Sequence, residues 1–268
     1  MLAYRPSQPP ATAPLESAVA SQGSRATRTG IIRSSRLTPA IALLATLCIA
    51  ACRSIPAPRP QAAPAAPAAA AAVPAGAARY RIDGGQSEVL ILVYRDGRMA
   101  NLGHNHVVAV RQLAGEISLA TDPTQSSWQL DFPVAALSVD EPQRRAAQGA
   151  EFQTRLDDVA IAGTRDHMLG PQLLDAAQFP AIHLQSEQIR SDSDGLHLSA
   201  RIVVRDHAVQ VDVPLALERS PEQLIASGEF DLTHAQLGLT PYSVALGALR
   251  VADRMHVRYR LVAQRAGD

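Results

Sequence analysis

The residues of this sequence best suited to chemistry are two histidines in the stretch NLGHNHVVAV, Asn101–Val110. His104 and His106 are two positions apart and lead into an apolar, β-branched segment, after an Asn101–Gly103 turn signal. In an extended strand, side chains two positions apart point to the same face, about 6.5–7 Å from each other. Two such imidazoles can converge on one divalent metal ion. They can equally form the polar face of a strand, hydrogen-bonding backbone or water at the rim of a fold.

A zinc site needs three or four protein or water ligands, and histidine and carboxylate are the ligand types that the body of this chain offers. None of the other candidates lies at a spacing that identifies it as a partner of His104 and His106. These candidates are His234, His183, His167 and Asp166. Zinc or another divalent metal at His104 and His106, in a metal-binding or stress-related periplasmic protein, therefore stays open as the alternative function.

Motifs typical of catalysis are missing from the sequence. Ser, His and Asp all occur, but G-x-S-x-G, H-E-x-x-H and phosphate-binding glycine loops do not. Arg-Asp-His occurs twice, at 165–167 and 205–207, yet adjacent residues point to opposite faces of a strand. We therefore expect that the protein is not an enzyme and needs no cofactor.

Alternation of apolar and polar residues predicts that most of the chain after residue 79 is antiparallel β-structure. A long strand is expected over 87–94, then strands over 115–121 and 126–134 separated by a turn at Asp122 and Pro123. In the last strand, Val257, Tyr259 and Leu261 alternate with charged or polar neighbours, which indicates one buried and one wet face. Eight or more such strands favour closure into a barrel, because closure removes sheet edges.

One stretch, residues 141–179, interrupts this pattern and is rich in Ala, Arg, Gln and Leu. Phe152, Leu156 and Val159 fall at helical spacing, which predicts a helix near 145–160 and a shorter one near 171–176. The fold class is thus mostly all-β, an antiparallel barrel with a short helical insertion.

The first part of the chain has the features of an export signal. A basic, Ser- and Arg-rich segment precedes the charge-free apolar run Leu37–Cys52, which is shorter than the about 20 residues that span a bilayer. The run ends in Ile49-Ala50-Ala51-Cys52, which resembles a bacterial lipobox and implies lipidation of Cys52. We expect residues 1–52 to be a signal peptide, and residues 53–78, almost pure Ala and Pro, to be a disordered tether.

Composition argues against nucleic-acid binding and against a disulfide in the remaining domain, residues 79–268. Lys plus Arg and Asp plus Glu both number 25, so the chain has no net charge with which to attract nucleic acid. Both cysteines, Cys48 and Cys52, precede this domain, which therefore contains no disulfide. The sequence leaves a homodimer open.

From Tyr80 to Ala263 the chain resembles the YceI-like family of secreted, lipocalin-like barrels that bind polyisoprenoid lipids. Five pieces carry the resemblance in order along the chain, and Asp206 departs from it where the family's hairpin turn has glycine. The pieces are YRIDGGQSEVLILV, LAGEI, DHMLGPQLLDAAQFPAIHLQS, ARIVVRDHAVQVDVPL and FDLTHAQLGLTPYSVALGALRVADRMHVRYRL.

The resemblance implies a cell-envelope lipoprotein that binds or carries an amphiphilic isoprenoid-type lipid inside its barrel. Side chains expected on the inward faces are candidates for contact with the ligand, with the histidine pair as the polar end of the cavity or as a rim feature. They are Val89, Ile91, Val93, His104, His106, Ile117, Leu119, Trp128, Leu130, Tyr242, Val257, Tyr259 and Leu261. Because Arg53, and not Asp, follows Cys52, we expect a lipid anchor in the outer membrane, on its periplasmic side.

Overall fold

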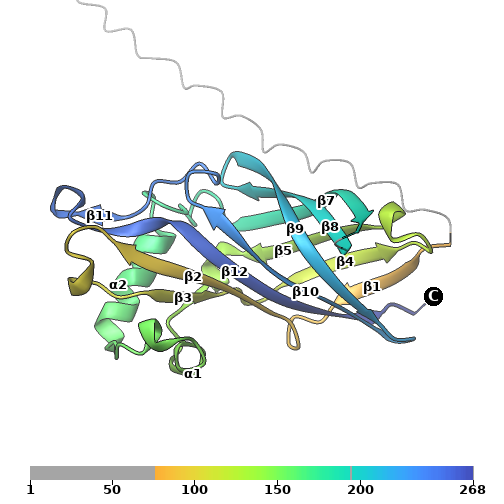
Figure 1. The fold of residues 1–268 in the computed structure, drawn as a ribbon, viewed down its shortest axis with the longest axis horizontal. Coiled ribbons are helices and arrows are strands. Elements are labelled where there is room, and N and C mark those ends of the chain that lie inside the picture. The colour runs from red at the N-terminus through yellow and green to blue at the C-terminus, as the bar shows by residue number, and fades with distance from the viewer. Residues whose placement is uncertain (1–75, 194, 268) are drawn as a thin grey trace, which may run out of the picture. The chain divides into compact units, whose positions relative to one another are not determined.

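The fold is an antiparallel β-barrel with short helices, as the alternation predicts (Figure 1). We describe it from a computed structural model, which describes residues 76–193 and 195–267; the expected signal peptide, Cys52 and nearly all of the expected tether lie outside these residues. The strands are β1 (Ala78–Ile82), β2 (Glu88–Asp96), β3 (His106–Ala109), β4 (Ala114–Leu119), β5 (Ser127–Pro133), β6 (Ser138–Val139), β7 (Ala181–Asp192), β8 (Gly195–Val204), β9 (His207–Arg219), β10 (Gln223–Thr233), β11 (Ser243–Val244) and β12 (Leu249–Arg265).

Eight strands close the barrel in the order β1-β4-β5-β7-β8-β9-β10-β12, and β12 pairs again with β1. The long β12 carries β1 and β2 on one edge: Ala263 lies opposite Ile82, and Tyr259 lies opposite Val89. Between β1 and β2, the Asp83 carboxylate accepts hydrogen bonds from the backbone N–H groups of Gly85 and Gln86, which closes a tight turn. The turn therefore separates β1 from β2, although both strands pair with β12. Strands β2, β3 and β6 extend the wall at one end.

The period-2 pattern sorts side chains to the two sides of the wall. In β12, Met255 and Val257 are buried while Arg254 and Arg260 are exposed, and in β9 Val211 and Val213 are buried between exposed neighbours. One cluster of buried aliphatic side chains from all around the barrel forms the core. In the turn between β8 and β9, Arg205 takes the left-handed backbone conformation, with φ at 57°.

The helical insertion differs from the sequence prediction. A single helix over 145–160 is wrong, and the predicted helix over 171–176 is a series of turns. The observed helices are α1 (Pro142–Ala146) and α2 (Asp158–Leu169), with one-turn 3-10 helices η1 (Ala100–Leu102), η2 (Pro123–Gln125), η3 (Val134–Ala136), η4 (Ala150–Phe152) and η5 (Ala245–Gly247). Within the described residues, no helix is long and apolar enough to cross a membrane.

The capping of α2 explains why the predicted helix is broken. Asp157 accepts a hydrogen bond of 2.8 Å from the backbone N–H of Ala160, which starts a new helix there. Phe152 and Val159, expected on one helical face, differ in burial. Phe152 is buried against β2 and β3, with its ring 5.6 Å from that of Tyr94, while Val159 is 81% exposed. The apolar spacing was coincidental, because the two residues belong to different elements.

Candidate functional site

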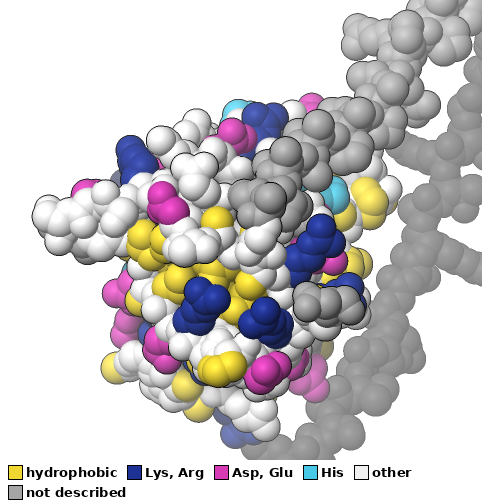
Figure 2. Space-filling model, turned by 90° about the vertical axis from the view of Figure 1, so that its right-hand side faces the viewer, with side chains coloured by type: hydrophobic (Ala, Val, Ile, Leu, Met, Phe, Trp, Pro, Cys, Tyr) yellow, Lys and Arg dark blue, Asp and Glu magenta, His cyan; other side chains and the backbone are white. Residues whose placement is uncertain are grey.

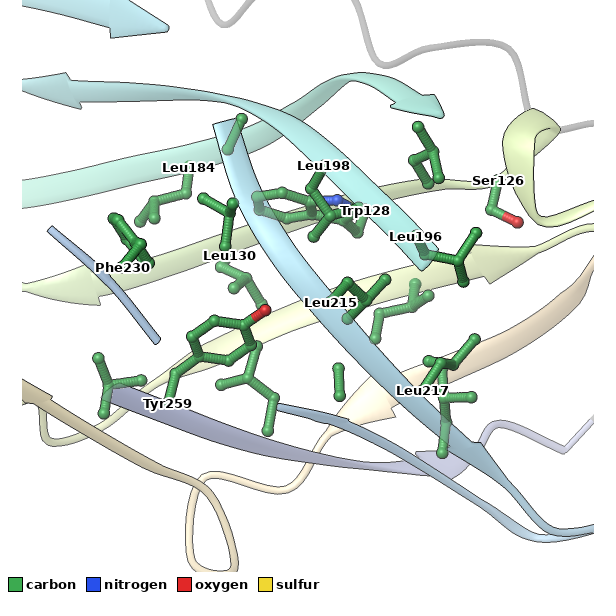
Figure 3. Close-up of a pocket in the computed structure, with 18 of the residues that line it drawn as sticks. Ser126, Trp128, Leu130, Leu184, Leu196, Leu198, Leu215, Leu217, Phe230 and Tyr259 are labelled. Atoms are coloured by element: carbon green, nitrogen blue, oxygen red, sulfur yellow. The ribbon is translucent and has the colours of Figure 1, made fainter. Parts of the chain in front are cut away.

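The interior of the barrel holds a cavity of about 140 Å³ whose walls are aliphatic and aromatic; we call it the apolar chamber. Its side chains point inward from strands on all sides of the barrel (Figure 3). Eight residues predicted from alternation line this chamber: Val89, Ile117, Leu119, Trp128, Leu130, Val257, Tyr259 and Leu261. Leu196 of β8 and Leu217 of β9, near the strand ends, extend the lining toward one end of the barrel. Figure 2 shows hydrophobic side chains gathered on that end, with cationic side chains beside them.

Two polar atoms belong to the aromatic side chains of the apolar chamber. The Tyr259 hydroxyl donates a hydrogen bond of 2.7 Å to the carbonyl oxygen of Pro214, and burial raises the pKa of Tyr259. The indole Nε1 of Trp128 is buried and has no hydrogen-bond partner among the described residues. A buried donor without an acceptor is destabilising.

A larger cavity of about 650 Å³ lies beside the first, at the barrel end covered by α2; we call it the histidine chamber. Phe132 lines both cavities. The remaining predicted residues, Ile91, Val93, His104, His106 and Tyr242, all line this chamber. His234 and, from α2, His167 and Met168 join them, so this chamber is lined by polar as well as apolar groups.

His106 is oriented by a buried carboxylate. Its Nδ1 lies 2.6 Å from Oδ2 of Asp140, while Oδ1 of Asp140 accepts from the backbone N–H of Val107 at 2.9 Å and from Arg145 at 2.6 Å. Burial alone would raise the pKa of Asp140, but the hydrogen bonds from His106, Val107 and Arg145 bring the pKa below its ordinary value. Asp140 is therefore an ionised carboxylate, 1% exposed, that holds the imidazole of His106 in one orientation.

Arg145 of α1 anchors the helical insertion to the histidine segment. Besides Asp140, its guanidinium donates to the carbonyl oxygens of Asn105 at 2.6 Å, Phe152 at 2.7 Å and Thr154 at 3.1 Å. The Asn105 side chain donates in turn to the carbonyl of Glu151 at 3.1 Å. Asn105 thus contacts the insertion, while His104 and His106 on either side of it line the chamber.

His104 lies against His106, with ring centroids 4.6 Å apart. Burial, and next the proximity of His106, lower the pKa of His104, so its imidazole is neutral near pH 7. The predicted third metal ligands are not gathered around the pair. His183 bonds to Asp131 on an exposed face, His167 contacts the ring of Tyr242, and Asp166 is exposed on α2. In the part of the chain that the structure describes, no three His, Cys, Asp or Glu side chains are close enough to hold a metal ion.

Sequence reasoning missed Asp140 and Arg145, which position His106, and the role of His234 as a wall residue. No local pattern marks Asp140 or Arg145, because their partners are 34 and 40 residues away along the chain. The alternation in β9 could have identified Leu215 and Leu217 as additional lining residues.

The sequence pattern of the YceI-like domain matches residues 80–263 of the chain. The chain belongs to the YceI-like domain family. No curated protein matches it at a significant level.

Among solved structures, this YceI-like chain is similar to BcnA of Burkholderia cenocepacia, at 14% identity and a TM-score of 0.48, over 68% of this chain and 98% of that one. It is also similar to a polyisoprenoid-binding domain from Saccharophagus degradans implicated in plant cell wall breakdown, at 13% identity and a TM-score of 0.47, over 71% and 99%. The YceI protein of Campylobacter jejuni follows at 8% identity and a TM-score of 0.42, over 60% and 85%.

Proposed function

We propose that the barrel binds and carries an amphiphilic, isoprenoid-type lipid. The observation that supports this most directly is the apolar chamber, an aliphatic cavity enclosed by the barrel strands and adjoining a second cavity with polar groups. A hydrocarbon chain fits the first environment and a polar head group fits the second. The family resemblance supplies the lipid class, and the proposed role requires no catalytic step.

The free energy for this role comes from removing hydrocarbon from water. Each buried CH₂ contributes about 0.8 kcal/mol, so one five-carbon isoprene unit placed in the apolar chamber contributes about 4 kcal/mol. Ordinary aliphatic side chains such as Leu130, Leu198 and Leu215 supply the walls without charged groups that would have to be desolvated.

Trp128 allows a direct test of lipid binding, because it is the only tryptophan in the chain and lines the apolar chamber. Titration of delipidated protein with a prenyl alcohol is expected to change the intensity and shift the maximum of its fluorescence, with saturation. Organic extraction of the protein as purified, followed by mass spectrometry, should identify an isoprenoid-type lipid. Absence of any extracted lipid together with an unchanged Trp128 spectrum would contradict the proposed function.

We further propose that the barrel is tethered to the periplasmic face of the outer membrane through a lipid on Cys52. The lipobox-like Ile49-Ala50-Ala51-Cys52 and the Ala- and Pro-rich segment after it support this placement. Two or more acyl chains give stable anchoring, whereas one alone binds reversibly.

Cys52→Ser is expected to abolish incorporation of a radiolabelled fatty acid and to release the protein from membranes into the soluble fraction. Cys48→Ser, four residues earlier in the apolar run, is the matched control and should leave labelling unchanged. Equal labelling of the two variants would show that Cys52 is not the lipidated residue.

A further inference from the structure

Two imidazoles on the wall of the histidine chamber use the same nitrogen to bond to the protein. Nδ1 of His106 bonds to the Asp140 carboxylate at 2.6 Å, and Nδ1 of His234 bonds to the carbonyl oxygen of Asp253 at 2.9 Å. Both residues line the chamber, and His234 is only 5% exposed. For neither ring does Nε2 have a hydrogen-bond partner among the described residues.

The partner of each Nδ1 determines where the ring proton lies. A carbonyl oxygen can only accept a hydrogen bond, so Nδ1 of His234 must carry the proton. The ionised Asp140 likewise only accepts, so Nδ1 of His106 carries the proton as well. In its neutral form each imidazole has only this one N–H, so Nε2 then has a lone pair that can accept a hydrogen bond.

Asp140, the carboxylate that holds His106, is also paired with the guanidinium of Arg145 at 2.6 Å. The neighbouring His104 is neutral for the reason given above. Arg95 and Arg250 at the chamber edge are bonded to the Gly103 carbonyl and to Asp96. The arginines that border this chamber are thus engaged by other groups, and the neutral His104 adds no charge.

We infer that the histidine chamber selects lipids whose head group donates a hydrogen bond, that is a free alcohol or phenol hydroxyl, to Nε2 of His106 or of His234. This inference rests on the proposed function, because the lipid chain is what brings the head group to this end of the barrel. A capped oxygen, as in an ether, has only lone pairs, and two lone pairs facing each other leave both groups unsatisfied in a partly apolar cavity.

The test compares geranylgeraniol with its methyl ether, which share one hydrocarbon chain and differ in the hydroxyl proton. Titration of the full chain, followed by Trp128 fluorescence, is expected to show about 3- to 10-fold tighter binding of the alcohol. Of His106→Phe and His234→Phe, the variant that removes the accepting nitrogen should weaken binding of the alcohol while retaining that of the ether, so that its preference falls toward unity. His183→Phe is the matched control: it removes another histidine paired with an aspartate, but one on the exposed face of β7, and should keep the preference.

The outcomes separate the inference from the proposed function. If neither compound binds, the proposed function fails. If wild-type protein binds both equally, or if both chamber variants keep the wild-type preference, the lipid role stands and the selection of a hydroxyl is wrong. Should His106→Phe fail to fold, because Asp140 loses a partner, His106→Asn takes its place: its amide nitrogen can keep the bond to Asp140, but it has no atom at the position of Nε2.

Discussion

Arg145→Met is expected to lower the free energy of unfolding by about 3–5 kcal/mol, the largest loss of stability that we anticipate from one substitution. The arginine is buried and donates to four groups, of which Asp140 is fully buried. Methionine retains much of the volume but leaves Asp140 ionised, buried and without the guanidinium that pairs with it. Removing one member of a buried pair costs far more than the pair itself contributes, because the remaining charge is uncompensated.

Urea unfolding measures this effect, and limited proteolysis locates it. Since Arg145 connects the insertion to the histidine segment through Asn105, Phe152 and Thr154, cleavage between α1 and α2 should become faster in the variant. Arg111→Met is the matched control: Arg111 makes a two-pronged contact with Glu141, but its side chain is 46% exposed, and its loss should cost under about 1 kcal/mol. A loss below about 1 kcal/mol for Arg145→Met would contradict the anchoring role.

The same carboxylate predicts how stability depends on pH. The folded-state pKa of Asp140 lies below its ordinary value of 3.8, so its contribution is fully present above that value and is lost as the pH falls through the folded-state pKa. Asp140→Asn should therefore be less stable than wild type near neutral pH, and the gap should narrow only below about pH 4. Urea midpoints of both proteins, measured across this range, provide the check. A gap independent of pH would show that Asp140 is not the titrating group.

The arrangement around Asp140 also shows why part of the site could be predicted from sequence and part could not. Val89, Ile91, Val257 and Tyr259 were expected on the inner face, and the structure places them on cavity walls, since strand alternation alone determines the side on which each residue lies. The orientation of His106 depends instead on Asp140, which arrives from a different element. Local patterns contain no information about such pairings.

The structure has the short helical insertion, but the predicted bounds of its helices were wrong for a related reason. Spacing placed Phe152 and Val159 on one helical face, but the cap at Asp157 and the burial of Phe152 beneath β2 and β3 divide the segment. Helix propensity is a weak preference that a buried aromatic contact overrides. The N-cap at Asp157 could have been predicted from the sequence, since aspartate is favoured at helix N-termini.

The second large effect concerns the apolar chamber. Ala226→Phe is expected to weaken binding of a prenyl alcohol by roughly 100- to 1000-fold, because the ring would occupy the space of about one isoprene unit, worth about 4 kcal/mol. Ala226 of β10 lines the chamber, is buried, and lies between Leu217 of β9 and Leu261 of β12. With a cavity of about 140 Å³ available, the larger side chain can be accommodated inside the barrel.

A graded series separates occlusion from misfolding. Ala226→Leu adds less volume and should give a smaller loss of affinity than Ala226→Phe, while both keep the wild-type unfolding midpoint or raise it, since they fill a cavity. Ala216→Phe is the matched control, because Ala216 lies on the neighbouring strand opposite Ser227 and is exposed on the outer face. Fluorescence titration of Trp128 measures all three. Wild-type affinity in a folded Ala226→Phe protein would mean that the lipid chain does not enter the apolar chamber, and that the histidine chamber alone holds the ligand.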